Sequence, residues 1–159
     1  KKNFKIFGIG NKKYTKKISN KFGYNLLLNK KIDLKNLKKN FKNVDLIIHC
    51  AGSGSVGLSN QENYKKNYLT TKAVLDFSIQ LKKKPKIIFM SSYSLYGNSY
   101  NNSIKENFTL RPLSSYAMTK KFSEEILLKY SKIYNLNITI FSYLNIFCFE
   151  IIMNYSTIM

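Results

Sequence analysis

Val44-Asp45-Leu46-Ile47-Ile48-His49, followed by the small-residue loop Cys50-Ala51-Gly52-Ser53-Gly54-Ser55, is the stretch that decides the fold of this chain. Its apolar residues are mostly β-branched, which is typical of a buried strand. In an open α/β sheet, ligands bind beyond the carboxyl ends of the strands, where such a loop would lie. The stretch therefore predicts an α/β fold with a mostly parallel sheet.

The rest of the chain continues this alternation of short apolar runs and longer helical patterns. Strands are expected over residues 4–7, 25–28, 44–49, 86–90 and 137–141. Helices are expected over residues 12–22, 34–41, 61–81 and 116–134. Strands that alternate with helices build βα units and a parallel sheet. We therefore expect one domain over residues 1–146, followed by an atypical tail over residues 147–159.

Composition limits the classes of partner. The formal net charge of +19 invites nucleic-acid binding, but the lysines are spread over every segment and Arg111 is the sole arginine. AT-rich codon usage would produce such a distribution without a binding surface, so we expect no nucleic-acid partner. No apolar run approaches the roughly 20 residues of a membrane-spanning helix, and the pattern of the first residues leads us to expect no signal peptide. We expect a cytoplasmic protein without a membrane partner.

The two cysteines, Cys50 and Cys148, lie far apart and belong to no cluster of metal-ligating residues. Neither a disulfide framework nor a metal site is indicated.

Tyr116-Ala-Met-Thr-Lys120 places a phenol and an ammonium one turn apart on a predicted helix. A lysine ammonium held beside a phenol favours the phenolate, and a serine hydroxyl such as that of Ser92 can hydrogen-bond the same substrate oxygen. A chance pair on an amphipathic helix is the alternative, since the chain holds 12 tyrosines. The context of the pair decides between the two interpretations.

Taken in order, the motifs resemble the NAD-dependent epimerase/dehydratase branch of the extended short-chain dehydrogenase/reductase superfamily, in particular UDP-glucose 4-epimerase-like members. The resemblance runs from about Val44 to Asn145 and includes Ser92 four residues before Tyr96-Gly97, then Tyr116 with Lys120. It implies a Rossmann-like three-layer fold. It also implies that a C-terminal substrate-binding lobe is missing and that residues 147–159 are a truncated or frame-shifted end.

The resemblance assigns roles to individual residues. Ser92, Tyr116 and Lys120 would be the catalytic set, with Tyr116 exchanging a proton with a sugar hydroxyl while NAD carries the hydride. The residues implied to contact the cofactor are Gly8, Gly10, Asn11, Asp33, Leu34, Cys50, Ala51, Gly52, Gly54, Asn67, Tyr116, Lys120 and Leu144. A nucleotide-sugar substrate would contact Ser92, Tyr116 and Asn145.

Some assignments keep alternatives. Asp33 is equally suited to cap a helix, and His49 fits the end of a strand better than a catalytic role. Gly8-Ile9-Gly10-Asn11-Lys12-Lys13 departs from the three-glycine phosphate loop of the family, and no acid is present to hold the adenosine ribose, so NADP is the alternative cofactor.

The function implied is therefore that of an NAD(P)-dependent nucleotide-sugar epimerase or dehydratase. A dTDP-4-dehydrorhamnose-reductase-like enzyme and a degenerate, non-catalytic nucleotide-binding fragment are the alternatives. A homodimer through the helices that flank the sheet is compatible with this assignment.

Overall fold

The computed structural model describes residues 4–10, 25–28, 33–52, 59–97, 108–142 and 150–155. The strands are β1 (Phe4–Gly10), β2 (Asn25–Leu28), β3 (Leu46–His49), β4 (Lys86–Met90), β5 (Ile138–Phe141) and β6 (Glu150–Tyr155). The helices are α2 (Leu34–Asn40), α3 (Asn60–Asn63), the π-helical η1 (Tyr64–Leu69), α4 (Thr70–Ser78), the 3₁₀ helix η2 (Tyr93–Tyr96) and α5 (Ser115–Tyr134). The predicted helix over residues 12–22 lies outside the described residues.

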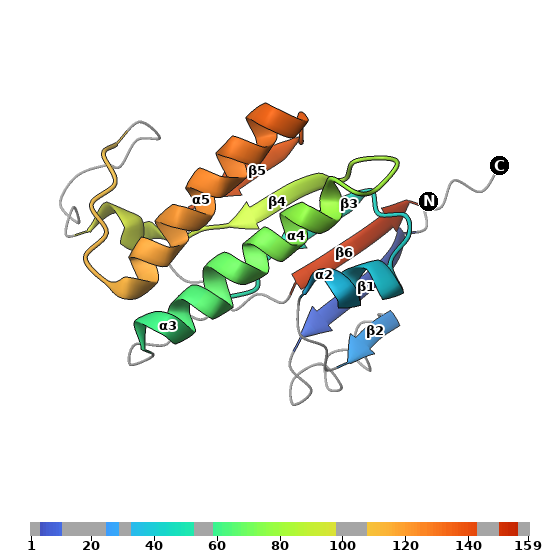
Figure 1. The fold of residues 1–159 in the computed structure, drawn as a ribbon, viewed down its shortest axis with the longest axis horizontal. Coiled ribbons are helices and arrows are strands. Elements are labelled where there is room, and N and C mark those ends of the chain that lie inside the picture. The colour runs from blue at the N-terminus through green and yellow to red at the C-terminus, as the bar shows by residue number, and fades with distance from the viewer. Residues whose placement is uncertain are drawn as a thin grey trace.

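The described strands form a single sheet in the order β2-β1-β6-β3-β4-β5 (Figure 1). β1 pairs with β2, β3 with β4, and β4 with β5 in parallel, which confirms the predicted mostly parallel sheet. Without β6, the strand order is β2-β1-β3-β4-β5. From the centre of the sheet, the chain order therefore proceeds from β1 to β2 toward one edge and from β3 to β4 and β5 toward the other. A sheet in which the order reverses in this way has its ligand site beyond the carboxyl ends of the strands at the reversal.

The strand β6 corrects our expectation that the last strand ends at residue 141. It lies between β1 and β3 and pairs antiparallel with both. The apolar run Ile151-Ile152-Met153 gives this segment the composition of a strand buried in the middle of a sheet. Composition alone does not tell which two strands such a segment enters, because that choice depends on pairing between distant parts of the chain.

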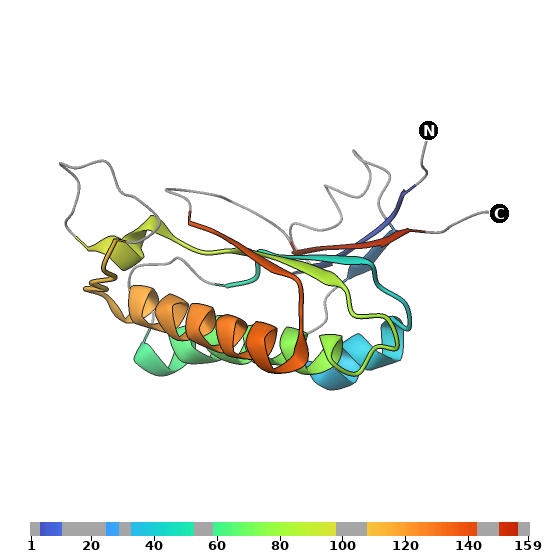
Figure 2. The same cartoon turned by 90° about the horizontal axis from the view of Figure 1, so that it is seen from above.

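The helices α2 to α5 all lie on one face of the sheet (Figure 2). Ile47 of β3 and Phe89 of β4 meet Leu75 and Phe77 of α4 and Leu127 of α5 in the core between the two layers, and each of these side chains is at most 1% exposed. Burial of side chains of this size contributes about 1.5–3 kcal/mol each. The core thus fixes the helices against β3 and β4.

The predicted helix over residues 61–81 consists of α3, η1 and α4 in direct succession. Ser59 starts it with a capping box, in which its hydroxyl accepts from the Glu62 amide while the Glu62 carboxylate accepts from the Ser59 amide. The π-helical turn η1 interrupts the α-helical hydrogen bonds, and such turns occur frequently at functional sites. It carries Asn67, one of the predicted site residues.

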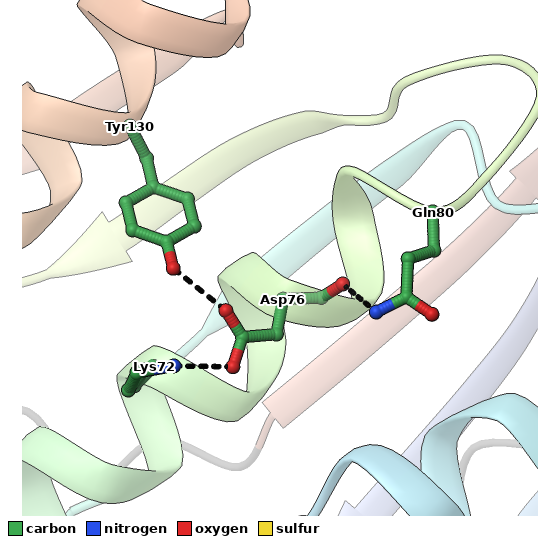
Figure 3. Close-up of polar contacts among 4 residues, drawn as sticks. All are labelled: Lys72, Asp76, Gln80 and Tyr130. Atoms are coloured by element: carbon green, nitrogen blue, oxygen red, sulfur yellow. Dashed lines mark hydrogen bonds and ion pairs between the residues drawn. The ribbon is translucent and has the colours of Figure 1, made fainter.

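A polar cluster joins the helices α4 and α5 on the side away from the sheet. The Tyr130 hydroxyl donates to Asp76 Oδ1 at 2.7 Å, and Lys72 Nζ lies 2.6 Å from Asp76 Oδ2 (Figure 3). Within the described residues, no helix combines the length and the apolar composition that crossing a bilayer requires. Nor do the described residues bring together three side chains able to hold a metal ion.

Candidate active site

Helix α5 carries the two residues of the predicted catalytic pair. The Ser114 hydroxyl caps the helix by accepting from the Ala117 amide at 3.1 Å. Tyr116 lies in the first turn, and Lys120 follows one turn later on the side that faces the sheet. Although lysine is among the least buried residue types, Lys120 is only 4% exposed. The cap therefore starts α5 where its first turns lie over the end of the sheet.

The buried amine of Lys120 ties α5 to the carboxyl end of β4. Its Nζ atom donates to the carbonyl oxygen of Met90, the last residue of β4, at 2.8 Å. It also lies 4.5 Å from the centre of the Phe89 ring. Burial lowers the pKa of Lys120 to about 8, because it disfavours the charged amine, while Cys50 and Glu124 partly offset this effect. The amine thus changes its charge close to neutral pH.

The loop after β3 reaches the same point. A Cβ atom on Gly52 would lie 2.4 Å from Asn67 Oδ1 and 3.6 Å from Lys120 Nζ. A side chain at this position would therefore require the Asn67 amide or the backbone to shift. Gly52, Asn67 and Lys120 come from three separate segments, and the structure brings them together.

Asn67 also braces the first turns of α5. Its side-chain amide donates to Thr119 Oγ1 at 3.1 Å, and the Thr119 hydroxyl in turn donates to the carbonyl oxygen of Tyr116 at 2.8 Å. The π-helical turn that carries Asn67 is thereby coupled to the backbone of the tyrosine. Asn67 thus connects η1 to the first turn of α5 through two hydrogen bonds.

Ser92 and Tyr116 are not hydrogen-bonded to each other in the described part of the chain. The Ser92 hydroxyl caps η2 by accepting from the Ser94 amide at 3.3 Å, and it lies 2.9 Å from Ser94 Oγ. The Tyr116 hydroxyl forms no hydrogen bond with another described residue. Both hydroxyls therefore retain capacity to bind a substrate oxygen.

Ser91 and Glu124 form a contact to which the sequence analysis gave no role. The Ser91 hydroxyl donates to the Glu124 carboxylate, one helical turn beyond Lys120. Burial raises the pKa of Glu124, while the Ser91 hydrogen bond and Lys120 act in the opposite direction. The spacing Lys120-x-x-x-Glu124 was the available signal, because residues four apart face the same side of a helix.

The first strand differs from our expectation at Gly8. The sequence placed Gly8 and Gly10 in a loop after residue 7, but β1 continues to Gly10. Gly8 pairs with Leu26 of β2 on one side and Ile151 of β6 on the other, because strands flank β1 on both sides. Gly8 therefore lies within the sheet, and Gly10 is the glycine at its carboxyl edge.

Asp33 and His49, for which the sequence left a structural alternative, both have partners within the protein. The Asp33 carboxylate caps α2, accepting from the backbone amide of Asn36 at 2.9 Å and from its side chain at 3.2 Å, and Leu34 packs against the core. His49 is fully buried at the end of β3, with its Nε2 atom 2.9 Å from Thr71 Oγ1. Both residues thus have structural partners.

The remaining predicted residues are placed only in part. Cys50 and Ala51 follow β3 at the carboxyl edge of the sheet and are half-buried. The other predicted contacts fall outside the described residues: Asn11, Gly54, Leu144 and Asn145.

A mostly parallel sheet with a reversal of strand order, and a polar site at the carboxyl ends of its parallel strands, define a Rossmann-like domain. Sequence comparison identifies the group within this class. Residues 1–150 match the NAD dependent epimerase/dehydratase family, and the chain belongs to that family.

Individual relatives agree with this membership. UDP-glucuronate 4-epimerase 6 of Arabidopsis thaliana is 35% identical over 97 residues, which are 58% of this chain and 21% of the relative. UDP-N-acetylglucosamine 4-epimerase of Methanobrevibacter ruminantium M1, solved with UDP-N-acetylmuramic acid, is 30% identical with a TM-score of 0.67, over 77% of this chain and 41% of that chain.

A further structure shows the same fold. UDP-glucuronic acid 4-epimerase of Bacillus cereus, solved with NAD, is 24% identical with a TM-score of 0.71, over 87% of this chain and 48% of that chain. The present chain thus spans less than half the length of each of these relatives.

Proposed function

We propose that this chain is the NAD-binding and proton-transfer part of a cytoplasmic nucleotide-sugar epimerase or dehydratase. The observation that carries the proposal is the buried amine of Lys120, which meets Gly52 and the end of β4 on the helix that also presents Tyr116. Burying an amine is costly, and perturbed ionisable groups in such positions are frequent at functional sites. Family membership then gives this site its chemical class.

The residues at the carboxyl edge fit a dinucleotide cofactor. Ala51 and Gly52 leave the backbone after β3 without large side chains, and Gly10 does the same at the last position of β1. Bound NAD would supply a hydride acceptor and donor. Lys120 would hold its ribose hydroxyls, and NADP remains the alternative.

Proton transfer would fall to the side chains of α5 and η2. Tyr116 would exchange a proton between its phenolic oxygen and a sugar hydroxyl, and Ser92 would donate a hydrogen bond to that same sugar oxygen. Lys120 would supply positive charge close to the phenol while its amine is protonated, below a pH of about 8. Asn67 and Thr119 would hold the first turn of α5 in place during this exchange.

The test is a single-turnover assay of the whole chain with NAD and either UDP-glucose or UDP-glucuronic acid. Reduction of NAD, followed by absorbance, should fall at least about a hundredfold in Tyr116→Phe, the lower end of the range for loss of a general acid–base group. Tyr134→Phe removes the same atom from the exposed end of the same helix and should react like wild type. Equal rates in both variants would contradict the assignment of Tyr116.

A second candidate is nucleotide binding without catalysis, the degenerate alternative. The position of Gly8 inside the sheet, with β6 beside it, favours this candidate because it removes one glycine from the phosphate loop. NAD binding in a calorimetric titration, without any NAD reduction by either UDP-sugar, would support it. Analysis of the sugar product would separate epimerase, dehydratase and reductase outcomes.

We include a homodimer through the helix layer in the proposal. Helix α5 exposes apolar side chains on its outer surface, among them Met118, Phe122, Leu128 and Ile133. Sedimentation should show a dimer that Phe122→Glu dissociates. A wild-type monomer at high concentration would contradict this part.

A further inference from the structure

A hollow of about 490 Å³ lies at the end of the helix layer remote from the candidate active site. It is formed where α2 and the turn that follows it meet the end of α4, two helices that pack side by side (Figure 1). The end of α4 leads into β4, so the hollow lies near the amino ends of the strands, whereas Lys120 lies at their carboxyl ends. Its volume is in the range of small-molecule sites.

The walls of the hollow are basic. Lys38, Lys42 and Lys82 line it, and all three side chains are exposed. None of the residues that line the hollow is acidic. Among the described residues, these three lysines form no ion pair and no side-chain hydrogen bond. Three cations thus face one hollow without an acidic partner from the described chain.

Other lysines near the hollow do have partners within the protein. In the run Lys82-Lys83-Lys84, Lys83 lies 2.7 Å from Asp45 Oδ1, and Lys84 donates to the carbonyl oxygen of Tyr134. Lys72 on α4 is likewise paired, with Asp76. Lys82 is the member of its run that lines the hollow instead of meeting a protein acceptor.

The floor of the hollow is apolar and fixed. Phe41, Phe77 and Leu81 form it, and both phenylalanines belong to the core cluster. Amide groups complete the rim: Gln80 is held by donation of its Nε2 atom to the Asp76 carbonyl at 2.8 Å, and Figure 3 shows its oxygen turned away from that contact. Asn43 contributes an exposed side-chain amide.

We propose that this hollow binds a small organic phosphate, with the phosphate held by Lys38, Lys42 and Lys82 and an apolar group on the Phe41–Leu81 floor. Clustered lysine ammonium groups bind phosphate through charge-assisted hydrogen bonds. Apolar contact for an attached ring or chain comes mainly from the half-buried Leu81, because Phe41 and Phe77 are only 4% and 1% exposed. The site is separate from the proposed cofactor site and does not depend on it.

The test is calorimetric titration of the whole chain with phenyl phosphate and with inorganic phosphate at low salt. Phenyl phosphate should bind several times more tightly than inorganic phosphate, because it alone has a group for the floor. The triple variant Lys38→Gln, Lys42→Gln and Lys82→Gln should weaken binding of phenyl phosphate at least tenfold. Its titration with NAD should match that of wild type, which separates this site from the active site.

The matched control is the triple variant Lys35→Gln, Lys39→Gln and Lys132→Gln, which removes the same charge from exposed lysines that do not line the hollow. It should bind phenyl phosphate within about twofold of wild type. Asn43→Trp, which places a bulky side chain at the rim of the hollow and keeps its lysines, should weaken binding. Equal losses in the two triple variants, or unchanged binding in Asn43→Trp, would overturn the proposal in favour of a diffuse effect of net charge.

Discussion

Two regions of the sheet, the β3–β4 side and the β1 side, differ in the polar contacts that the structure describes. On the β3–β4 side, side chains connect the strands to the helices: Lys120 bonds the end of β4, and Asn67 bonds Thr119 on α5. On the β1 side, the backbone of Gly8 pairs with β2 and β6, and the side chains of Phe7 and Ile9 pack in or against the core. The polar contacts of the first side can therefore be removed by single side-chain substitutions, whereas the pairing of Gly8 is made by backbone atoms.

This difference has a consequence for chemistry. The side-chain network fixes the groups that would move protons, and each link in it can be removed by one substitution. The pairing of β1 with β6 instead governs how much of the glycine segment is left at the edge for a phosphate. Substitutions in the network should therefore have large, local and separable effects, which the following variants measure.

The largest effect on the free energy of unfolding is expected from removing the Phe89 ring, which lies against the Lys120 amine. Phe89 is fully buried and lies under Lys120 Nζ, so Phe89→Ala should cost about 3–5 kcal/mol in the free energy of unfolding. Phe141→Ala, at an exposed position on the adjacent strand β5, should cost less than about 0.5 kcal/mol. Urea denaturation of both variants measures the difference, and similar costs would show that the core does not centre on β4.

The next effect is a pH dependence of the free energy of unfolding, caused by Lys120. Its pKa is about 8 in the folded chain and near 10.5 when unfolded, so between these values the unfolded state binds the extra proton. Stability should therefore rise with pH across that window. Below pH 8, burying the charged amine lowers the free energy of unfolding by its full amount, at most about 3 kcal/mol.

Lys120→Met isolates this contribution, because the other titrating groups are common to both proteins. The difference in unfolding free energy between wild type and Lys120→Met should move in favour of wild type as the pH rises from 8 to 10.5. Denaturation curves at a series of pH values check it. A difference that stays constant across the window would mean that the amine is not buried as described.

A smaller effect is expected where the loop after β3 meets η1. Gly52→Ala places a Cβ atom 2.4 Å from Asn67 Oδ1, so a side chain or the backbone must shift, at a cost of about 1–3 kcal/mol. Adding Asn67→Ala removes the clashing atom and should recover part of this cost in a double-mutant cycle. Strictly additive costs would show that the two residues do not touch.

Local patterns predicted the elements whose signals lie within one segment. The apolar runs at 25–28 and 86–90 gave β2 and β4 with their observed bounds, and the aspartate before Leu34 gave a helix cap. The pattern over residues 116–134 predicted a helix, and α5 spans Ser115–Tyr134. Each of these depends on contacts or periodicities within a few residues, which a sequence displays directly.

Features that depend on distant partners were not predictable in the same way. The place of β6 follows from its pairing with two strands far away in the sequence, and the Gly8 position follows from β6. The π-helical turn at Asn67 and the Ser91–Glu124 contact arise where two elements meet. A single sequence does not show which distant elements contact each other.

The central claim is that the buried amine of Lys120 belongs to a cofactor-binding active site, and calorimetric titration with NAD tests it most directly. Wild type should bind NAD, and Lys120→Met should bind it at least tenfold more weakly. Lys121→Met, the neighbouring residue on the same helix but directed toward Glu125, should bind like wild type. Equal affinities for NAD in the two variants, or no binding by wild type, would contradict the account.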